Sequence, residues 1–325
     1  MSTAVTVDAV RAAGGEPVAR LMDRLELRMH ELATGYGDEL AAHAGSTIAA
    51  GGKRLRPLLV FLSAGVPTPE RDELLSAAVA VELVHAATLV HDDVLDGSAL
   101  RRGRPTVVAT GGRLAATSTG DLLFSRAFNE LARIGSADCV RVLSRASSEL
   151  AAGELMQRAD AWTPVIASRY FDRCRLKTAV LFRAACELGA IASGGVGEAV
   201  SGLAQFGERI GVAFQVFDDV LDVTGPPELT GKPRGADLLD GTVTLPLILA
   251  RDRDPELAAL DLRSIRTAEQ ASKVCARIAR TDALELARGE ALELVAASKR
   301  LLPELPERQR TALELVADGV VGRYS

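Results

Sequence analysis

The chain has 325 residues, of which 48% are hydrophobic and 25% are charged, and its formal net charge is −5 at pH 7. This composition excludes a disordered, a collagen-like or a disulfide-framework protein, and the negative charge argues against general binding to nucleic acid or to an anionic membrane surface. Its uncharged stretches fall short of the roughly 18 apolar residues needed for a transmembrane segment.

Helical patterns run along the whole chain. The first 15 residues are small and polar, so we expect no export signal there. Apolar side chains then recur at intervals of three and four residues, first in residues 21–32 and last in residues 284–295, which is typical of amphipathic helices. Short Gly- and Pro-rich segments separate these patterns, and none is a domain linker. We therefore predict an all-α protein of about a dozen helices, folded as one domain over residues 1–325.

A basic segment follows two glycines in residues 51–57, whose sequence is Gly-Gly-Lys-Arg-Leu-Arg-Pro. Flexible glycines before Lys53 and Arg56 at a helix start favour phosphate binding through backbone N–H groups and cations. A helix boundary with a solvated charged face would explain the same residues, and the spacing is not that of a nucleotide P-loop.

One five-residue sequence, Asp-Asp-Val-Leu-Asp, occurs twice, at residues 92–96 and at residues 218–222. Each copy lies towards the carboxyl end of an apolar helical run, where the helix dipole disfavours acidic side chains. A single copy would be explained as a solvated acidic turn, but two identical copies favour a function.

Helical spacing places Asp92 and Asp96 on one face of their helix and Asp218 and Asp222 on one face of theirs. Two such pairs of carboxylates suit Mg²⁺, which prefers oxygen ligands and completes its shell with water and phosphate. Zinc fits poorly because no His or Cys has suitable spacing.

Three arginines follow the first aspartate cluster in a loop containing Gly and Pro: Arg101, Arg102 and Arg104. The planar guanidinium group suits bidentate binding of phosphate, so these residues next to carboxylate-bound Mg²⁺ predict a substrate with at least a diphosphate. A solvated basic loop is the alternative.

Four further polar residues accompany the clusters: Lys177, Thr178, Gln215 and Lys232. The two lysines would offset the charge of a departing diphosphate, and the threonine and glutamine would offer neutral dipoles near a developing cation. Taken singly, each is explained as a surface or capping residue.

These motifs, in this order, resemble the trans-polyprenyl diphosphate synthase family, the enzymes that elongate isoprenoid diphosphates head to tail. The resemblance spans residues 51–246. It implies a bundle of mostly antiparallel helices around a deep central cavity, usually in a homodimer. The matching segments are residues 51–57, 85–96, 101–105, 120–121, 153–157, 177–179, 214–222, 231–232 and 244–246.

The resemblance also implies residue roles and a reaction in which isopentenyl diphosphate attacks an allylic cation left by diphosphate departure. Isopentenyl diphosphate would be bound by Lys53, Arg56, His85 and Arg102. The allylic diphosphate would be bound by Arg101 and Lys232. Three Mg²⁺ ions per active site would be held by Asp92, Asp96, Asp218 and Asp222. The catalytic positions beside the breaking C–O bond would be Lys177, Thr178 and Gln215.

One position departs from the family pattern, because Thr242 stands where many relatives carry lysine. Losing one charge-assisted contact costs about 1.5–3 kcal/mol, so we expect weaker allylic binding in an enzyme that is still active.

Product length is predicted from the residues one and more turns before Asp92. Ala87 and Thr88 are not aromatic, and short-chain relatives typically close the product tunnel with large side chains there, so the resemblance implies a product longer than C15. The sequence of residues 85–91 is most similar to that of relatives that make C30 to C50 products, and we predict that length. Core packing explains Phe124 and Phe128 on a neighbouring helical segment; if these rings instead form the floor of the tunnel, the product stops at C20.

Three other classes compete with this prediction. A terpene cyclase would share the fold but needs no second diphosphate site, and it usually has a different second metal motif. A non-catalytic subunit of a prenyl synthase would usually have degraded aspartate motifs. A magnesium-dependent phosphohydrolase would not need so much apolar helix surface beside its carboxylates.

The four cysteines lie in helical patterns without Cys-x-x-Cys spacing. This usage indicates packed thiols in a reducing compartment, so we expect no disulfide, no zinc and a cytoplasmic location. The residues are Cys139, Cys174, Cys186 and Cys275.

Overall fold

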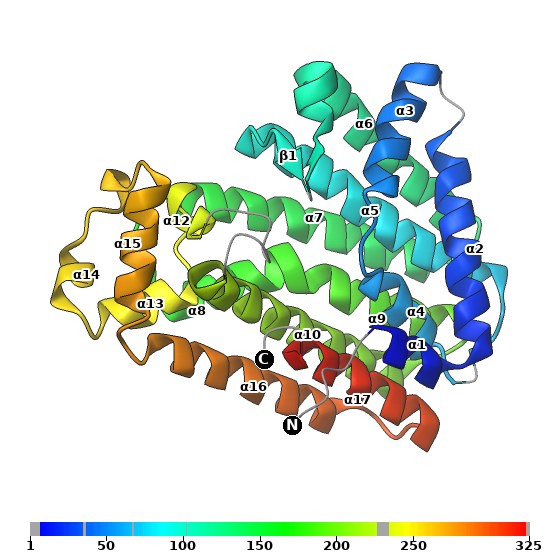
Figure 1. Ribbon diagram of the computed structural model, residues 1–325. Helices are drawn as coiled ribbons and strands as arrows, with labels where there is room; N and C mark the ends of the chain where they lie inside the picture. Colours follow the sequence, from blue (N-terminus) through cyan, green and yellow to red (C-terminus); the bar gives the residue numbers. More distant parts are fainter. Residues whose placement is uncertain (1–6, 35–36, 67, 102, 226–233, 323–325) are drawn as a thin grey trace.

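A computed structural model describes residues 7–34, 37–66, 68–101, 103–225 and 234–322. These residues are mostly helical, and the strands among them are β1 (Leu100–Arg101) and β2 (Arg104–Pro105), which pair antiparallel. The all-α prediction is confirmed (Figure 1). The helices are α1 (Val7–Gly14), α2 (Glu16–Ala33), α3 (Asp38–Ala49), α4 (Leu55–Ser63), α5 (Asp72–Asp96), α6 (Val107–Ala132), α7 (Ala137–Asp160), α8 (Ala167–Cys174), the π-helical turn η1 (Arg175–Ala179), α9 (Val180–Ala192), α10 (Gly197–Thr224), α12 (Ala236–Leu239), α13 (Leu245–Arg251), α14 (Pro255–Ala259), the 3₁₀ turn η2 (Leu262–Ser264), α15 (Ala268–Ile278), α16 (Ala283–Leu301) and α17 (Glu307–Gly322).

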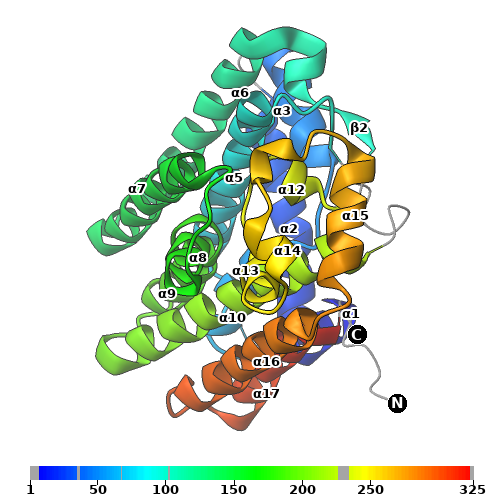
Figure 2. The same cartoon turned by 90° about the vertical axis from the view of Figure 1, so that its left-hand side faces the viewer.

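Two long helices, α5 and α10, occupy the centre of the molecule. α5 packs against α4, α6 and α9, while α10 packs against α9 on one side and α16 on another, as both ribbon views show (Figures 1 and 2). Their apolar sequences are explained by this position, because neighbours cover several faces of each helix. The two aspartate clusters lie at the carboxyl ends of these central helices.

α5 has a length and composition that would allow it to cross a membrane, and it is the one helix with this property in the described ranges. In the structure, however, 72% of its most apolar 18-residue window is buried inside the protein. Packing in the core therefore accounts for its apolar character.

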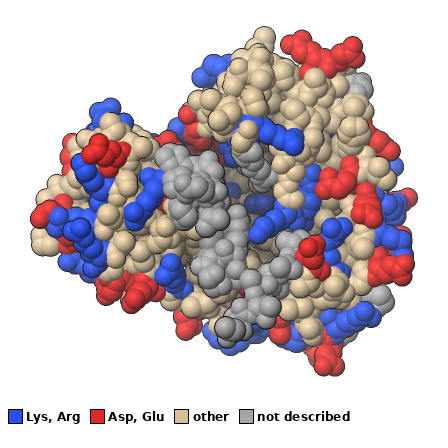
Figure 3. Space-filling view, viewed as in Figure 1, with Lys and Arg blue, Asp and Glu red and all other residues tan. Residues whose placement is uncertain are grey.

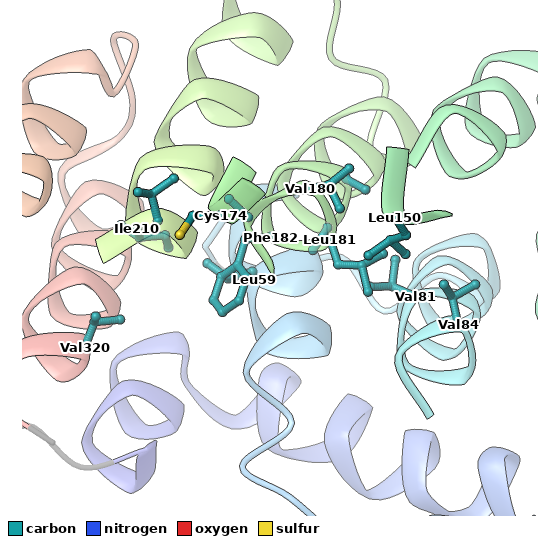
Figure 4. Close-up of a cluster of buried hydrophobic side chains, with 14 of the residues drawn as sticks. Leu59, Val81, Val84, Leu150, Cys174, Val180, Leu181, Phe182, Ile210 and Val320 are labelled. Carbon is teal, nitrogen blue, oxygen red and sulfur yellow. The ribbon is translucent and has the colours of Figure 1, made fainter. Parts of the chain in front are cut away.

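The core beneath the aspartate clusters is built from close contacts between α5, α7, α9 and α10. Val81 and Val84 of α5 lie beside Leu150 of α7 and Leu181 of α9, and all four side chains are buried (Figure 4). Burying an aliphatic side chain of this kind contributes about 1.5–3 kcal/mol relative to leaving it exposed. This packing fixes the positions of the helices that carry the polar residues.

The short helices α12–α15 gather at one end of the bundle, where α13 contacts α8, and α13 and α15 contact α10 (Figure 2). α12 has four residues and α14 has five, too few for a helical repeat to be recognised in the sequence. The described residues therefore contain more helices than the dozen predicted.

All four cysteines are buried as free thiols. Cys139 lies in α7, Cys174 in α8, Cys186 in α9 and Cys275 in α15. Burial raises the pKa of Cys186 to about 12, which keeps this thiol protonated at neutral pH. The cysteines thus serve as small packed side chains.

Candidate active site

The two aspartate clusters face one cavity of about 350 Å³, which we call the acidic cavity. Asp92 and Asp96 come from the end of α5, which terminates where Gly97 takes the left-handed backbone conformation (φ 62°). Asp218 and Asp222 come from the end of α10. The four residues predicted to hold Mg²⁺ therefore line the same space, at two helix ends whose dipoles add to the negative potential.

The acidic cavity has an excess of negative charge, because its described lining contains seven aspartates and four basic residues. Burial raises the pKa of Asp92 to about 6, with further contributions from Glu154 and Asp96 and an opposing effect of Lys177. Burial also raises the pKa of Asp219 well above its ordinary value. A diphosphate would bind here only together with cations that balance the carboxylates.

Lys177 and Thr178 lie in η1, a π-helical turn between α8 and α9. Such turns insert one extra residue into a helix, re-aim its side chains and are frequent at functional sites. α7 packs so closely on this turn at Gly153 that a Cβ atom there would lie 2.8 Å from the backbone nitrogen of Lys177. Both predicted residues line the acidic cavity.

A chain of hydrogen bonds orients the polar groups beside Thr178. Its hydroxyl donates to Oε1 of Gln215 over 2.6 Å, and Nε2 of Gln215 donates to Oδ1 of Asp219 over 2.7 Å. The hydroxyl of Tyr170, which is buried, donates to the other oxygen of Asp219 over 2.7 Å. The amide of Gln215 therefore has a fixed orientation, with its oxygen towards Thr178.

A second chain, of alternating charge, connects the aspartate cluster of α5 to Lys177. Oδ1 of Asp96 lies 2.6 Å from Nη2 of Arg158, and Nε of Arg158 lies 3.0 Å from Oε1 of Glu154. Oε2 of Glu154 lies 2.5 Å from Nζ of Lys177. Burial acts to raise the pKa of Glu154, but the bonds from Lys177 and Arg158 outweigh it and the pKa is lowered. We call these four residues the ion chain.

Asp222 has a structural contact in addition to its predicted metal role. Its two carboxylate oxygens accept hydrogen bonds from the backbone N–H groups of Ala236 (3.1 Å) and Asp237 (3.4 Å) at the start of α12. The carboxylate thereby holds the wall of the acidic cavity that includes Asp237 and Thr242. Thr242 brings a hydroxyl and no cation to that wall.

A second cavity, of about 620 Å³, adjoins the first, and we call it the basic cavity. Lys53, Arg56 and His85, the described residues predicted to bind isopentenyl diphosphate, all line it. Arg101 and Asp218 line both cavities, so the two spaces share a wall. Figure 3 shows Lys and Arg side chains gathered in the hollow at the centre of this face.

The hairpin and the start of α4 position these cations. Arg101 in β1 lies 2.8 Å from Oδ1 of the buried Asp93, which holds its guanidinium at the wall between the cavities. Arg54 caps α4 with a left-handed backbone (φ 48°) and binds Glu26 and Glu82. Because Arg54 is neutralised in this way, it serves to order residues 51–56.

The oxygen donors of the acidic cavity fit magnesium. Asp92, Asp96 and Asp218 supply carboxylate groups from opposite walls, and oxygen is the ligand that Mg²⁺ prefers. Within the described parts of the chain, no group of three or more acidic, His or Cys side chains comes close enough to hold a metal ion by itself. The arrangement therefore suits cations that a diphosphate shares with the protein.

The structure adds residues to the site that the sequence did not identify. Arg158, Glu154 and Tyr170 were not predicted, since their roles come from contacts between helices. His43 of α3, which was not predicted either, lines the basic cavity, as does Arg104 of β2, one of the three arginines of the predicted loop. The predicted residues Arg102 and Lys232 lie outside the described residues.

The helical fold places an acidic cavity and a basic cavity side by side. The chain belongs to the polyprenyl synthetase family, whose model matches residues 38–281. The predictions that it belongs to this family and is a prenyltransferase are confirmed.

Known relatives resemble the chain over most of its length. It is 43% identical over 239 residues to heptaprenyl diphosphate synthase component 2 of Geobacillus stearothermophilus, covering 73% of this chain and 74% of the relative. It is 34% identical to geranylgeranyl diphosphate synthase of Methanosarcina mazei, covering 88% and 90%. A polyprenyl synthase from Caulobacter crescentus, solved with calcium and isoprenyl diphosphate, matches with a TM-score of 0.91, 33% identity and 100% coverage of both chains.

Proposed function

We propose that the protein is a Mg²⁺-dependent prenyltransferase that joins isopentenyl diphosphate head to tail to an allylic diphosphate and makes an all-trans polyprenyl diphosphate. The observation that carries this proposal is the pair of adjoining cavities with opposite charge. The acidic cavity suits an allylic diphosphate with its cations, and the basic cavity suits isopentenyl diphosphate. The calcium and isoprenyl diphosphate in the Caulobacter relative support this assignment.

The residues suggest a role for each wall in the reaction. Asp92, Asp96, Asp218 and Asp222 would hold Mg²⁺, which would supply positive charge to the leaving diphosphate. Lys177, oriented by Glu154, adds a cation on the same side. As the allylic C–O bond breaks, Thr178 and Gln215 present oriented dipoles to the allylic carbon. The isopentenyl double bond then forms the new C–C bond, and the departed diphosphate accepts the proton that is lost.

Apolar side chains would protect the allylic cation from water. Leu89, Val90, Phe182 and Phe214 line the basic cavity beside its polar residues. The rings of Phe182 and Phe214 are 5.6 Å apart, and the guanidinium of Arg56 lies 4.7 Å from the centre of the Phe182 ring. Exclusion of water favours attack by the isopentenyl double bond over hydrolysis to an alcohol.

The direct test incubates purified protein with Mg²⁺, isopentenyl diphosphate and, separately, dimethylallyl, geranyl, farnesyl or geranylgeranyl diphosphate. We expect elongated products by mass spectrometry after dephosphorylation, and no product with EDTA. Asp218→Asn should lower activity at least a hundredfold, whereas the exposed control Asp23→Asn should retain wild-type activity. Failure to elongate any primer, or formation of cyclic hydrocarbons, would refute the proposal.

We propose a product of C30 to C50, with C20 as the alternative. Relatives of this chain include both heptaprenyl and geranylgeranyl diphosphate synthases. Along α5 before Asp92, the positions Ala87, Val84 and Ala80 carry small or aliphatic buried side chains, which favours a long product. Phe124 stacks on His91 with ring centres 5.9 Å apart, so it remains the side chain proposed to stop chain growth at C20. The product ladder with farnesyl diphosphate distinguishes the two lengths.

The competing classes are less well supported by the site. A terpene cyclase or a phosphohydrolase would have no use for a basic cavity beside the acidic one. A non-catalytic subunit would not need the ordered groups around Lys177 and Gln215. The Geobacillus relative is named component 2, which suggests an enzyme of two different chains. If this chain alone elongates no primer, a two-component enzyme replaces the proposal that the chain acts by itself.

We further propose a cytoplasmic homodimer. Leu155 of α7 and Leu114 of α6 have exposed fractions of 72% and 83%, and a second copy would cover such apolar side chains. Light scattering during gel filtration should give twice the chain mass of 34.2 kDa. A mass of one chain would contradict the homodimer, and cell fractionation tests the location.

A further inference from the structure

Arg158 lines the acidic cavity and is the residue of the ion chain that binds Asp96 of α5. Through Glu154 it is also connected to Lys177. Arg158 and Glu154 are one turn apart on α7, so the helix itself fixes their spacing. The close packing of α7 on η1 at Gly153 holds this part of α7 in place.

A divalent cation bound by Asp96 would compete with Arg158 for the same carboxylate. The ion pair is partly open to solvent, with 44% of the Arg158 side chain and 34% of the Asp96 side chain exposed. Ion pairs of this exposure contribute at most about 1 kcal/mol, so a divalent cation can replace the guanidinium. Metal binding would therefore release one arm of Arg158 into the cavity.

The released guanidinium would be positioned to bind a phosphate group in this cavity. Arg158 lines it together with Arg101 and Lys177. Its contact with Glu154 is through Nε, which leaves Nη1 and Nη2 to bind two phosphate oxygens. While it pairs with Asp96, the positive charge of Arg158 offsets part of the negative charge of the aspartates. Once metal ions offset that charge, Arg158 can offset the negative charge of the substrate diphosphate instead.

We propose that Arg158 is a further diphosphate-binding residue, which exchanges its contact with Asp96 for the substrate diphosphate when a divalent cation binds. This inference rests on the proposed function, since it assumes that a diphosphate binds in the acidic cavity. It predicts effects of opposite sign when Arg158 is replaced. Metal binding without diphosphate becomes stronger, because a competitor is lost, and diphosphate binding with metal becomes weaker.

The test compares full-length wild type with Arg158→Gln by isothermal titration calorimetry. Mn²⁺ titrated without phosphate should bind the variant about two- to fivefold more tightly, as expected for loss of a partly exposed ion pair. Inorganic pyrophosphate titrated at saturating Mg²⁺ should bind it about tenfold or more weakly, as expected for loss of a charge-assisted bond. Arg158→Lys keeps the positive charge but lacks the two parallel N–H donors of the guanidinium group. It should give an intermediate pyrophosphate affinity.

Arg141→Gln serves as the matched control, since Arg141 lies on the same helix and pairs with Asp138 at the surface. It should leave both affinities at their wild-type values. In a folded Arg158→Gln variant, any pattern other than tighter Mn²⁺ with weaker pyrophosphate overturns the role of Arg158. If Arg158→Gln has a lowered melting temperature, Arg158→Lys decides, and a wild-type pyrophosphate affinity in that variant overturns the role. Failure of the wild type to bind pyrophosphate with Mg²⁺ would instead overturn the proposed function, and this inference with it.

Discussion

The carboxyl group of Asp92 shows how a site residue can reduce stability. Its pKa of about 6 in the folded protein lies above the ordinary value of 3.8, mainly because it is buried. The folded state therefore holds this proton more tightly than the unfolded chain does. The stabilisation from this proton is fully present below about pH 4 and is lost as the pH rises through 6.

Asp92→Asn should consequently stabilise the metal-free protein at pH 8. The gain in unfolding free energy should be at most about 3 kcal/mol, which corresponds to the shift in pKa, and should disappear towards pH 4. Denaturant unfolding in EDTA across this pH range measures the effect. Asp23→Asn, at a residue with 80% side-chain exposure, is the control without a pH-dependent change. A gain at pH 8 no larger than that at pH 4 would contradict the prediction.

Tyr170 offers a second test at the scale of one residue. Tyr170→Phe removes the hydroxyl that donates to buried Asp219, so the carboxylate that accepts a hydrogen bond from Gln215 loses its own support. We expect the unfolding free energy to fall by about 1–3 kcal/mol. We also expect kcat to fall roughly tenfold with little change in KM, because the variant disturbs orientation more than binding. Wild-type kcat in a folded variant would show that this orientation is unimportant.

At the scale of elements, the contact between α7 and η1 determines where Lys177 lies. Gly153→Ala would place a Cβ atom 2.8 Å from a backbone nitrogen and 2.9 Å from a backbone carbon. Because backbone atoms cannot rotate away, we expect a loss of about 1–3 kcal/mol in unfolding free energy and a lowered kcat. Chemical denaturation and steady-state kinetics measure the two effects.

Gly289→Ala is the matched control for that substitution. Gly289 lies inside α16, and apart from its chain neighbours and the adjacent backbone of its own helix no atom lies within 4 Å of the position that a Cβ would take. Alanine should raise stability there by about 0.5–1 kcal/mol, because glycine is the poorer helix former. Equal effects of the two substitutions would show that the α7–η1 contact does not restrict the site.

The elements also explain which parts of the site the sequence could predict. The repeated aspartates could be paired from helical periodicity alone, since Asp92 and Asp96 are one turn apart. The ion chain could not, because Arg158 and Lys177 are brought together by the packing of α7 on η1 and α5. The π-helical turn itself has no sequence signature, so the neighbours of Lys177 could not be derived from a 3.6-residue repeat.

At the scale of the whole molecule, the fold class followed from composition and periodicity, but the arrangement of the helices did not. The apolar helical runs before the two aspartate clusters were visible in the sequence, and they lie in α5 and α10, most of whose apolar residues are buried. The short helices at the end of the bundle pack against α8 and α10. These contacts join distant parts of the chain, so no local sequence pattern could predict them. The resemblance to a known family supplied the roles that periodicity left open.

Product length is a property of the whole bundle, because the growing chain must pass between several helices. Ala87→Phe adds a large ring at a buried position of α5, one turn before His91, and should shorten the product by one or more isoprene units. Overpacking should cost about 1–3 kcal/mol, so Thr88→Phe at the neighbouring half-buried position is a second variant. Mass spectrometry of the product ladder measures the change.

Ala132→Phe at the exposed end of α6 is the control for product length and should leave the ladder unchanged. If Ala87→Phe and Thr88→Phe both fold and give wild-type ladders, the tail does not run along α5. Phe124→Ala would then be the next variant, since that ring stacks on His91 near the aspartate cluster.

The wall between the two cavities would make the binding of the two proposed substrates thermodynamically interdependent. Arg101 and Asp218 line both cavities. A ligand in one cavity that pairs with either charge therefore changes the affinity of the other cavity for its own ligand. Linkage requires this influence to be reciprocal: the factor by which a bound allylic diphosphate changes the affinity for isopentenyl diphosphate equals the factor in the opposite direction. Arg101 and Asp218 thus belong to both sites, and their charges couple the two affinities equally in both directions.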